Sequence, residues 1–173
     1  MRGSTFRRLV TKDEADFLEN LLGFLEDRRI PYCVIGGQAV NAYVEPLISL
    51  DLAIAVAVDD PHDLVDSLGK VFRVTEHPHS LNLVQHGSEL RVQIQTDPRY
   101  AAFVPASEHR EVLGRSMRVA RLEDVLKGKI WAVTDPQRRG SKRQKDLADI
   151  ARILESYPHL RAHVPENVLK HLL

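Results

Sequence analysis

The stretch Tyr32-Cys33-Val34-Ile35-Gly36-Gly37-Gln38-Ala39, followed closely by Asp51-Leu52-Ala53-Ile54, decides the fold of this chain. In it an apolar strand ends in two glycines, a helix-forming segment follows, and the next strand opens on a carboxylate. Two glycines at a strand-to-helix junction let a phosphate group approach the backbone N–H groups at the positive end of a helix. The order of these features predicts a phosphate site placed beside a divalent metal ion.

Length and composition predict an ordinary globular protein. The 173 residues suffice for one domain, or one domain with a small appendage, and 43% of them are apolar and 28% charged. Lysine plus arginine and aspartate plus glutamate both number 24, so the net charge gives no argument for nucleic acid. No apolar run reaches the roughly 18 residues that span a bilayer, and no secretory signal begins the chain. We therefore expect a cytoplasmic protein without membrane contact.

The only cysteine, Cys33, lies inside an apolar strand and has no partner for an intramolecular disulfide. We expect it to behave as a small buried hydrophobic residue rather than as a catalytic thiol, because no base is placed to activate it.

Apolar periodicity and turn residues predict the remaining elements. A capping box at Thr11–Glu14 opens the first helix. The expected helices cover residues 12–28, 37–43, 61–68, 122–133, 142–154 and 165–172. The expected strands cover residues 32–35, 50–58, 72–75, 81–85 and 90–96, with a short strand near 119 and a loop through Pro98 and Pro105. This order predicts an α+β fold: a mixed sheet with helices on one face and a helical C-terminal part. We expect an α/β core at residues 1–120, with residues 121–173 packed on it.

Two separate segments resemble the nucleotidyltransferase superfamily, in particular the AbiEii-type toxins and related minimal nucleotidyltransferases. The first runs from Val34 to Ala42 and continues at Asp51–Ile54. The second comprises Arg121–Lys129 and, after a basic loop, Lys145–Ile150, where a lysine-bearing helix is followed by a Lys-Asp-x-x-Asp helix. The resemblance implies a nucleotidyltransferase-like fold over most of the chain.

The resemblance also implies transfer of a nucleoside monophosphate from a nucleoside triphosphate (NTP), through two Mg²⁺ ions held by three carboxylates. Asp51 matches the first carboxylate, the second falls on Ala53, and the third falls on Gln93. Val44 and Leu47 replace a Gly and an Arg that the family usually carries before the first Asp. Because Ala53 and Gln93 carry no negative charge, we expect a degenerate site in which Asp51 is the one residue left to bind a metal ion.

Further residues match nucleotide-binding positions of the family. By resemblance, Gly36, Gly37 and Ser49 line the nucleotide site, and Lys129 and Lys145 either face the triphosphate or support the site. The basic segment suggests a weaker RNA-binding site, at Arg138, Arg139, Lys142 and Arg143; a solvated loop explains the same charges equally simply.

Three functions remain open from the sequence. The favoured one is a nucleotidyltransferase-fold protein that binds a nucleotide, an RNA such as tRNA, or a protein partner, with weak or no transfer activity. The second is an active NTP-dependent toxin with a cognate antitoxin, in which Glu89 or Asp97 supplies a missing acid. The third is a non-catalytic interaction module. The resemblance implies Mg²⁺ and an NTP as cofactors only if the site still binds them.

Overall fold

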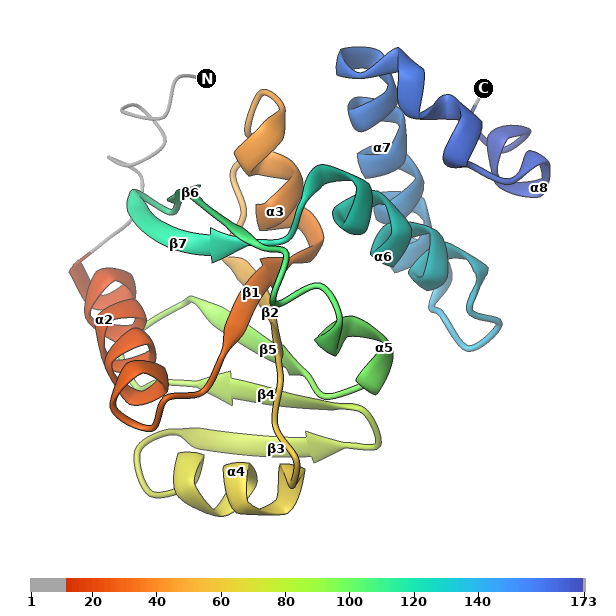
Figure 1. The fold of residues 1–173 in the computed structure, drawn as a ribbon. Helices are drawn as coiled ribbons and strands as arrows, with labels where there is room; N and C mark the ends of the chain where they lie inside the picture. Colours follow the sequence, from red (N-terminus) through yellow and green to blue (C-terminus); the bar gives the residue numbers. More distant parts are fainter. Residues whose placement is uncertain (1–11, 173) are drawn as a thin grey trace.

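A seven-stranded mixed sheet forms the centre of the computed structural model, which describes residues 12–172 (Figure 1). Its strand order is β3-β4-β5-β2-β1-β7-β6. The strands are β1 (Tyr32–Ile35), β2 (Asp51–Val56), β3 (Arg73–His77), β4 (Ser80–Val84), β5 (Arg91–Gln95), β6 (Glu108–Val112) and β7 (Arg115–Val119). The β2–β5 and β1–β7 pairs are parallel, and the other pairs are antiparallel. The α+β prediction is confirmed.

Helices lie on both sides of the central strands, so the expectation of helices on one face was wrong. They are α2 (Lys12–Asp27), α3 (Gly36–Tyr43), α4 (Pro61–Leu68), α5 (Pro98–Ala101), α6 (Leu122–Thr134), α7 (Gly140–Ser156), the 3₁₀ helix η1 (Pro158–His163) and α8 (Glu166–Leu169). In Figure 1, α2 lies to one side of β1 and β2, and α5 and α6 lie to the other. None of the helices between residues 12 and 172 is long and apolar enough to cross a membrane. Thr11 of the predicted capping box is outside the described residues.

The segment between β5 and α6 was predicted least well. It was expected to be a loop with one short strand, but it contains α5 and the β6–β7 hairpin. The side chain of Asp97 accepts a hydrogen bond from the backbone N–H of Arg99 and thereby caps α5. Strand β6 buries only Val112, so it lacks the alternation of apolar and polar residues that identifies a half-buried strand.

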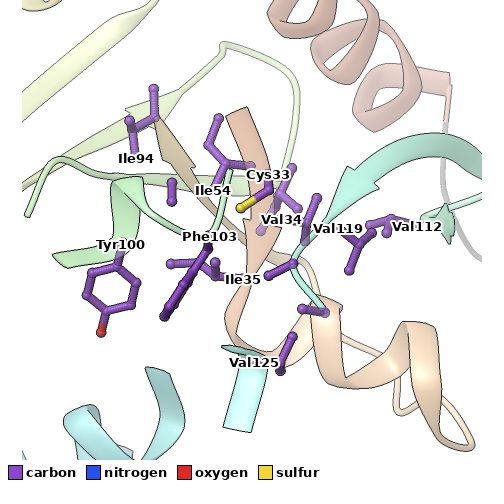
Figure 2. Close-up of a cluster of buried hydrophobic side chains, with 14 of the residues drawn as sticks. Cys33, Val34, Ile35, Ile54, Ile94, Tyr100, Phe103, Val112, Val119 and Val125 are labelled. Carbon is purple, nitrogen blue, oxygen red and sulfur yellow. The ribbon is translucent and has the colours of Figure 1, made fainter. Parts of the chain in front are cut away.

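Strands β1 and β2 alternate between the two faces of the sheet. Leu52 and Ile54 point to one face, while Ala53 and Ala55 share the other face with their partners Ile35 and Cys33. Figure 2 shows the side chain of Cys33 among the buried hydrophobic residues. Burial raises the pKa of the Cys33 thiol to about 12.

This burial predicts that Cys33 is chemically silent in the folded protein. At pH 8 the thiol stays protonated and has no exposed surface, so we expect a thiol-specific disulfide reagent to label it only after unfolding in denaturant. Absorbance of the released chromophore, with and without denaturant, measures the difference. Rapid labelling of the native protein would contradict the buried position.

A buried ion network holds the C-terminal helices together. Lys129 Nζ of α6 lies 3.1 Å from Asp146 Oδ1 and 2.8 Å from Asp149 Oδ2, both on α7. From the α6–α7 loop, the guanidinium of Arg138 donates hydrogen bonds to both oxygens of Asp146, at 2.9 and 3.1 Å. Only 1% of the Asp146 side chain is exposed. A buried carboxylate is tolerated here because two cations surround it.

The same network reaches the loop that leads into β2. Arg152 Nη1 donates a hydrogen bond to Asp149 at 2.9 Å, and Arg152 Nη2 donates to Asn41 Oδ1 at 2.9 Å and to the Glu45 carbonyl at 2.7 Å. Asn41 exchanges two hydrogen bonds with the backbone of Leu47, at 2.8 and 3.0 Å. Helix α7 and helix α3 together therefore fix the loop of residues 44–50.

Removing the central acid of this network should destabilise the fold. We expect Asp146→Ala to lower the free energy of unfolding by about 3–5 kcal/mol, because Lys129 and Arg138 lose a buried counter-charge. Glu155→Ala, on an exposed position of α7, is the matched control and should change it by less than about 0.5 kcal/mol. Urea unfolding measures both. Equal stability of the two variants would show that the network contributes little.

Candidate functional site

The turn from β1 into α3 brings the backbone close to β2. Gly36 has a φ of +69°, which an L side chain rarely adopts, and a Cβ there would lie 3.4 Å from the Cβ of Ala53. A Cβ on Gly37 would lie 3.8 Å from Asp149 Oδ2. No side chain caps the N-terminus of α3. Backbone N–H groups at this helix end are therefore left without a side-chain partner, as a phosphate site requires.

Parallel pairing of β2 and β5 brings the three predicted carboxylate positions together. Asp51 lies opposite Arg91, and Ala53 lies opposite Gln93. Asp51 and Gln93 are exposed, and Ala53 is half-buried beside Gly36. We define the candidate site by six residues: Gly36, Gly37, Asp51, Ala53, Arg91 and Gln93.

Ser49 connects α3 with the start of β2. The Ser49 hydroxyl accepts a hydrogen bond from the backbone N–H of Asp51 at 3.1 Å, and the Ser49 carbonyl accepts one from Gln38 Nε2 at 2.9 Å. Only 1% of Gln38 is exposed. Ser49 therefore positions Asp51 relative to the glycine turn; direct contact of Ser49 with a nucleotide stays a prediction.

Sequence analysis missed a cation in the candidate site. Arg91 Nε lies 2.8 Å from Asp51 Oδ1, in an ion pair whose side chains are 71% and 50% exposed. Alternation along β5 places Arg91 on the same face as Gln93. The strand register could not be read from the sequence, and only the pairing of β5 with β2 places Arg91 opposite Asp51.

The donor set of the site does not suit the two Mg²⁺ ions that the resemblance implies. Ala53 offers no ligand, Gln93 offers no charge, and Asp51 already faces a guanidinium. Across residues 12–172, no group of three or more His, Cys, Asp or Glu side chains is arranged to hold a metal ion.

Neither of the alternative acids completes the site. Asp97 follows the far end of β5, about 20 Å along an extended chain from Arg91, and its carboxylate caps α5 and pairs with Arg99 at 3.0 Å. Glu89 is exposed and precedes β5. Neither belongs to a three-ligand group with Asp51 in the described part of the chain.

The predicted basic residues divide into structural and exposed ones. Arg138 belongs to the buried ion network, and Arg143 Nη2 donates hydrogen bonds to the carbonyls of Asp135 and Arg138 at 3.0 and 3.2 Å. Arg139, Lys142 and Lys145 are exposed. Lys129 supports α7 through its two carboxylate partners. Contacts of these cations with RNA or triphosphate stay predictions.

A separate pocket of about 400 Å³ lies beside α3. It is bounded by α3, by Pro46 and by the β6–β7 hairpin, with the lining residues Gln38, Asn41, Ala42, Pro46, Arg110, Glu111, Val112, Leu113 and Gly114. None of these belongs to the candidate site, although Gln38 connects the two regions through Ser49.

Sequence comparison and structural comparison give different answers for this chain. No protein-family profile matches the sequence, and neither does any curated protein. The fold, in contrast, is similar to that of ANT(2'')-Ia in complex with adenylyl-2''-tobramycin: the TM-score is 0.56 at 15% identity, over 88% of this chain and 97% of that one. It is also similar to an antigenic nucleotidyltransferase-like protein from Paracoccidioides brasiliensis, with a TM-score of 0.50 at 18% identity over 84% and 78% of the two chains.

Sequence identities of 15–18% show a similarity of fold and nothing about activity or ligands. The glycine turn before α3, the acid that opens β2 and the parallel strand β5 are the elements on which the predicted resemblance rested. The AbiEii-type assignment stays a prediction. The chain has a nucleotidyltransferase-like fold.

Proposed function

We propose that this protein binds a nucleoside triphosphate at the candidate site and transfers its nucleoside monophosphate weakly or not at all. The observation that carries the proposal is the Ala53–Gln93 pair, which puts two uncharged side chains opposite each other where the resemblance implies carboxylates. The core at residues 1–120 would carry the site, and the helices at residues 121–173 would support it through the buried ion network.

Retention of phosphate binding is supported by the backbone. Gly36 keeps the left-handed conformation and the close approach to Ala53 that the turn requires, and the N-terminus of α3 is not capped by a side chain. These features do not depend on the missing acids. A triphosphate can therefore still accept hydrogen bonds from backbone N–H groups at this position.

Loss of transfer is supported by charge. A pair of metal ions lowers the barrier of nucleotidyl transfer by neutralising the charge that develops between the attacking and leaving oxygens. Each 1.36 kcal/mol of lost stabilisation slows a reaction about tenfold, so losing the several kcal/mol of such a pair slows it by about three orders of magnitude or more. Ala53 and Gln93 cannot replace that contribution.

Two other functions remain as outcomes of the experiments. An active toxin with a cognate antitoxin would show Asp51-dependent transfer of labelled nucleotide to RNA or protein. A non-catalytic interaction module would bind no nucleotide. An RNA ligand such as tRNA would contact the exposed Arg139 and Lys142 and would bind less tightly as salt rises.

Nucleotide binding should raise the thermal stability. At 100 times its Kd, a nucleoside triphosphate stabilises the native state by about 2.7 kcal/mol. Gly37→Asp should abolish the shift, because its carboxylate would repel the phosphates at the N-terminus of α3. Gly23→Asp, where a Cβ meets nothing within 4 Å, is the matched control on α2 and should keep the shift. Differential scanning fluorimetry with four NTPs measures this. If no NTP raises the melting temperature of the wild-type protein, the proposed nucleotide binding is wrong.

Restoring the acids should restore metal binding. We expect Ala53→Asp/Gln93→Asp to bind Mn²⁺ together with Asp51, and the wild-type protein to bind it at least tenfold more weakly. Titration followed by the electron paramagnetic resonance of free Mn²⁺ gives both affinities. Gln144→Asp/Asn167→Asp adds the same charge at exposed positions of two different helices, α7 and α8, and should not gain a site. Tight Mn²⁺ binding by the wild-type protein would contradict the loss of the metal site.

A further inference from the structure

We infer that the guanidinium of Arg91 takes the place of the divalent metal ion at the candidate site, so that nucleotide binding here needs no metal. The inference rests on the proposed function and adds the identity of the positive charge that meets the phosphates. It starts from the mismatch between the donor set of the site and the two ions that the fold implies.

Arg91 lies next to the positions where the resemblance implies metal ligands. It lies beside Gln93 on β5 and opposite Asp51 on β2, the first of the three carboxylate positions. Its Nε is 2.8 Å from Asp51 Oδ1. A cation at this distance from the remaining acid satisfies the charge that would otherwise bind Mg²⁺.

The guanidinium retains capacity for a ligand. A guanidinium carries five N–H donors, and the ion pair with Asp51 engages the one at Nε. The side chain is 71% exposed. Its planar fork matches two phosphate oxygens, which makes arginine a frequent partner of phosphate groups.

The charge balance explains why a metal is dispensable. Three carboxylates around a triphosphate repel it, and two divalent ions must neutralise that repulsion before the nucleotide binds. Here the charges of Asp51 and Arg91 cancel, and Ala53 and Gln93 add none. The anion therefore meets a site with no net negative charge, in which the guanidinium can donate hydrogen bonds to the phosphates without a metal ion.

The pair has little value for the fold itself. Exposed ion pairs contribute about 0–1 kcal/mol to stability, and the buried side chains of β2 and β5 already fix the two strands. Replacing Arg91 should therefore leave the protein folded, which separates an effect on binding from an effect on structure. Thermal unfolding of each variant verifies this.

Isothermal titration with ATP tests the inference, in EDTA and in excess Mg²⁺. We expect the wild-type protein to bind ATP in EDTA at least as tightly as in Mg²⁺, because Mg²⁺ shields the phosphates from Arg91. Arg91→Gln should weaken binding tenfold or more, and Arg91→Lys, which keeps the charge but loses the fork, should lie between. Arg73→Gln is the matched control, since Arg73 is an exposed arginine on β3 at the sheet edge, and it should bind like wild type.

Asp51→Asn gives a change of opposite sign for the two explanations. If Arg91 is the phosphate partner, removing its counter-ion frees the guanidinium and tightens ATP binding several-fold in EDTA. If Asp51 instead anchors a metal ion, the same substitution weakens binding in Mg²⁺ and has no effect in EDTA.

The failures of the two proposals are distinguishable. ATP binding that requires Mg²⁺ and is unchanged in Arg91→Gln would overturn the role of Arg91 and leave the proposed nucleotide binding intact. Absence of ATP binding by the wild-type protein in both buffers would overturn both.

Discussion

The parallel register between β2 and β5 is the constraint on which the rest of the site depends. It sets Asp51 against Arg91 and Ala53 against Gln93 on the face that carries the candidate site. On the opposite face, the same register buries Leu52 and Ile54 of β2 beside Val92 and Ile94 of β5. A shift of one residue would turn these apolar side chains to the face that carries the candidate site. Burial on one face therefore determines which polar groups meet on the other.

The separation of core residues and site residues onto two faces of the strands explains how a fold can persist when the residues of its site change. Residues on the two faces of a strand alternate, so the acids of a metal site can change without a change in the core behind them. Substitutions on an exposed face usually alter stability by less than about 0.5 kcal/mol. The two carboxylates that the resemblance implies lie on such a face, so their absence from the proposed site is compatible with intact packing of the sheet. The site pairs one acid with one arginine.

Local signals predicted the part of the fold that carries the site. The glycine pair, the helix after it and the alternation from Asp51 onward were enough to place α3 and β2. Strand β6 and helix α5 were not predicted, because a charged edge strand and a four-residue helix have no apolar periodicity. The Asp51–Arg91 pair could not be predicted from local patterns, since it depends on a pairing between strands distant in sequence.

The buried ion network required tertiary information for a different reason. The Lys-Asp-x-x-Asp helix was recognised by resemblance, but the sequence gives no indication that Lys129 and Arg138 share one carboxylate. Counting charges in the basic segment suggested a surface for RNA. The structure shows that two of its arginines make hydrogen bonds within the protein. Arg138 donates to Asp146, and Arg143 donates to two backbone carbonyls of the α6–α7 loop.

The tie between α7 and the loop before β2 has a consequence for biosynthesis. Arg152 contacts the Glu45 carbonyl and the Asn41 side chain across 107 and 111 residues of sequence. A ribosome that adds about 5–20 residues per second needs about 5–20 s to make that intervening stretch. Throughout that interval the nascent loop can form its contacts with α3 but not those with α7.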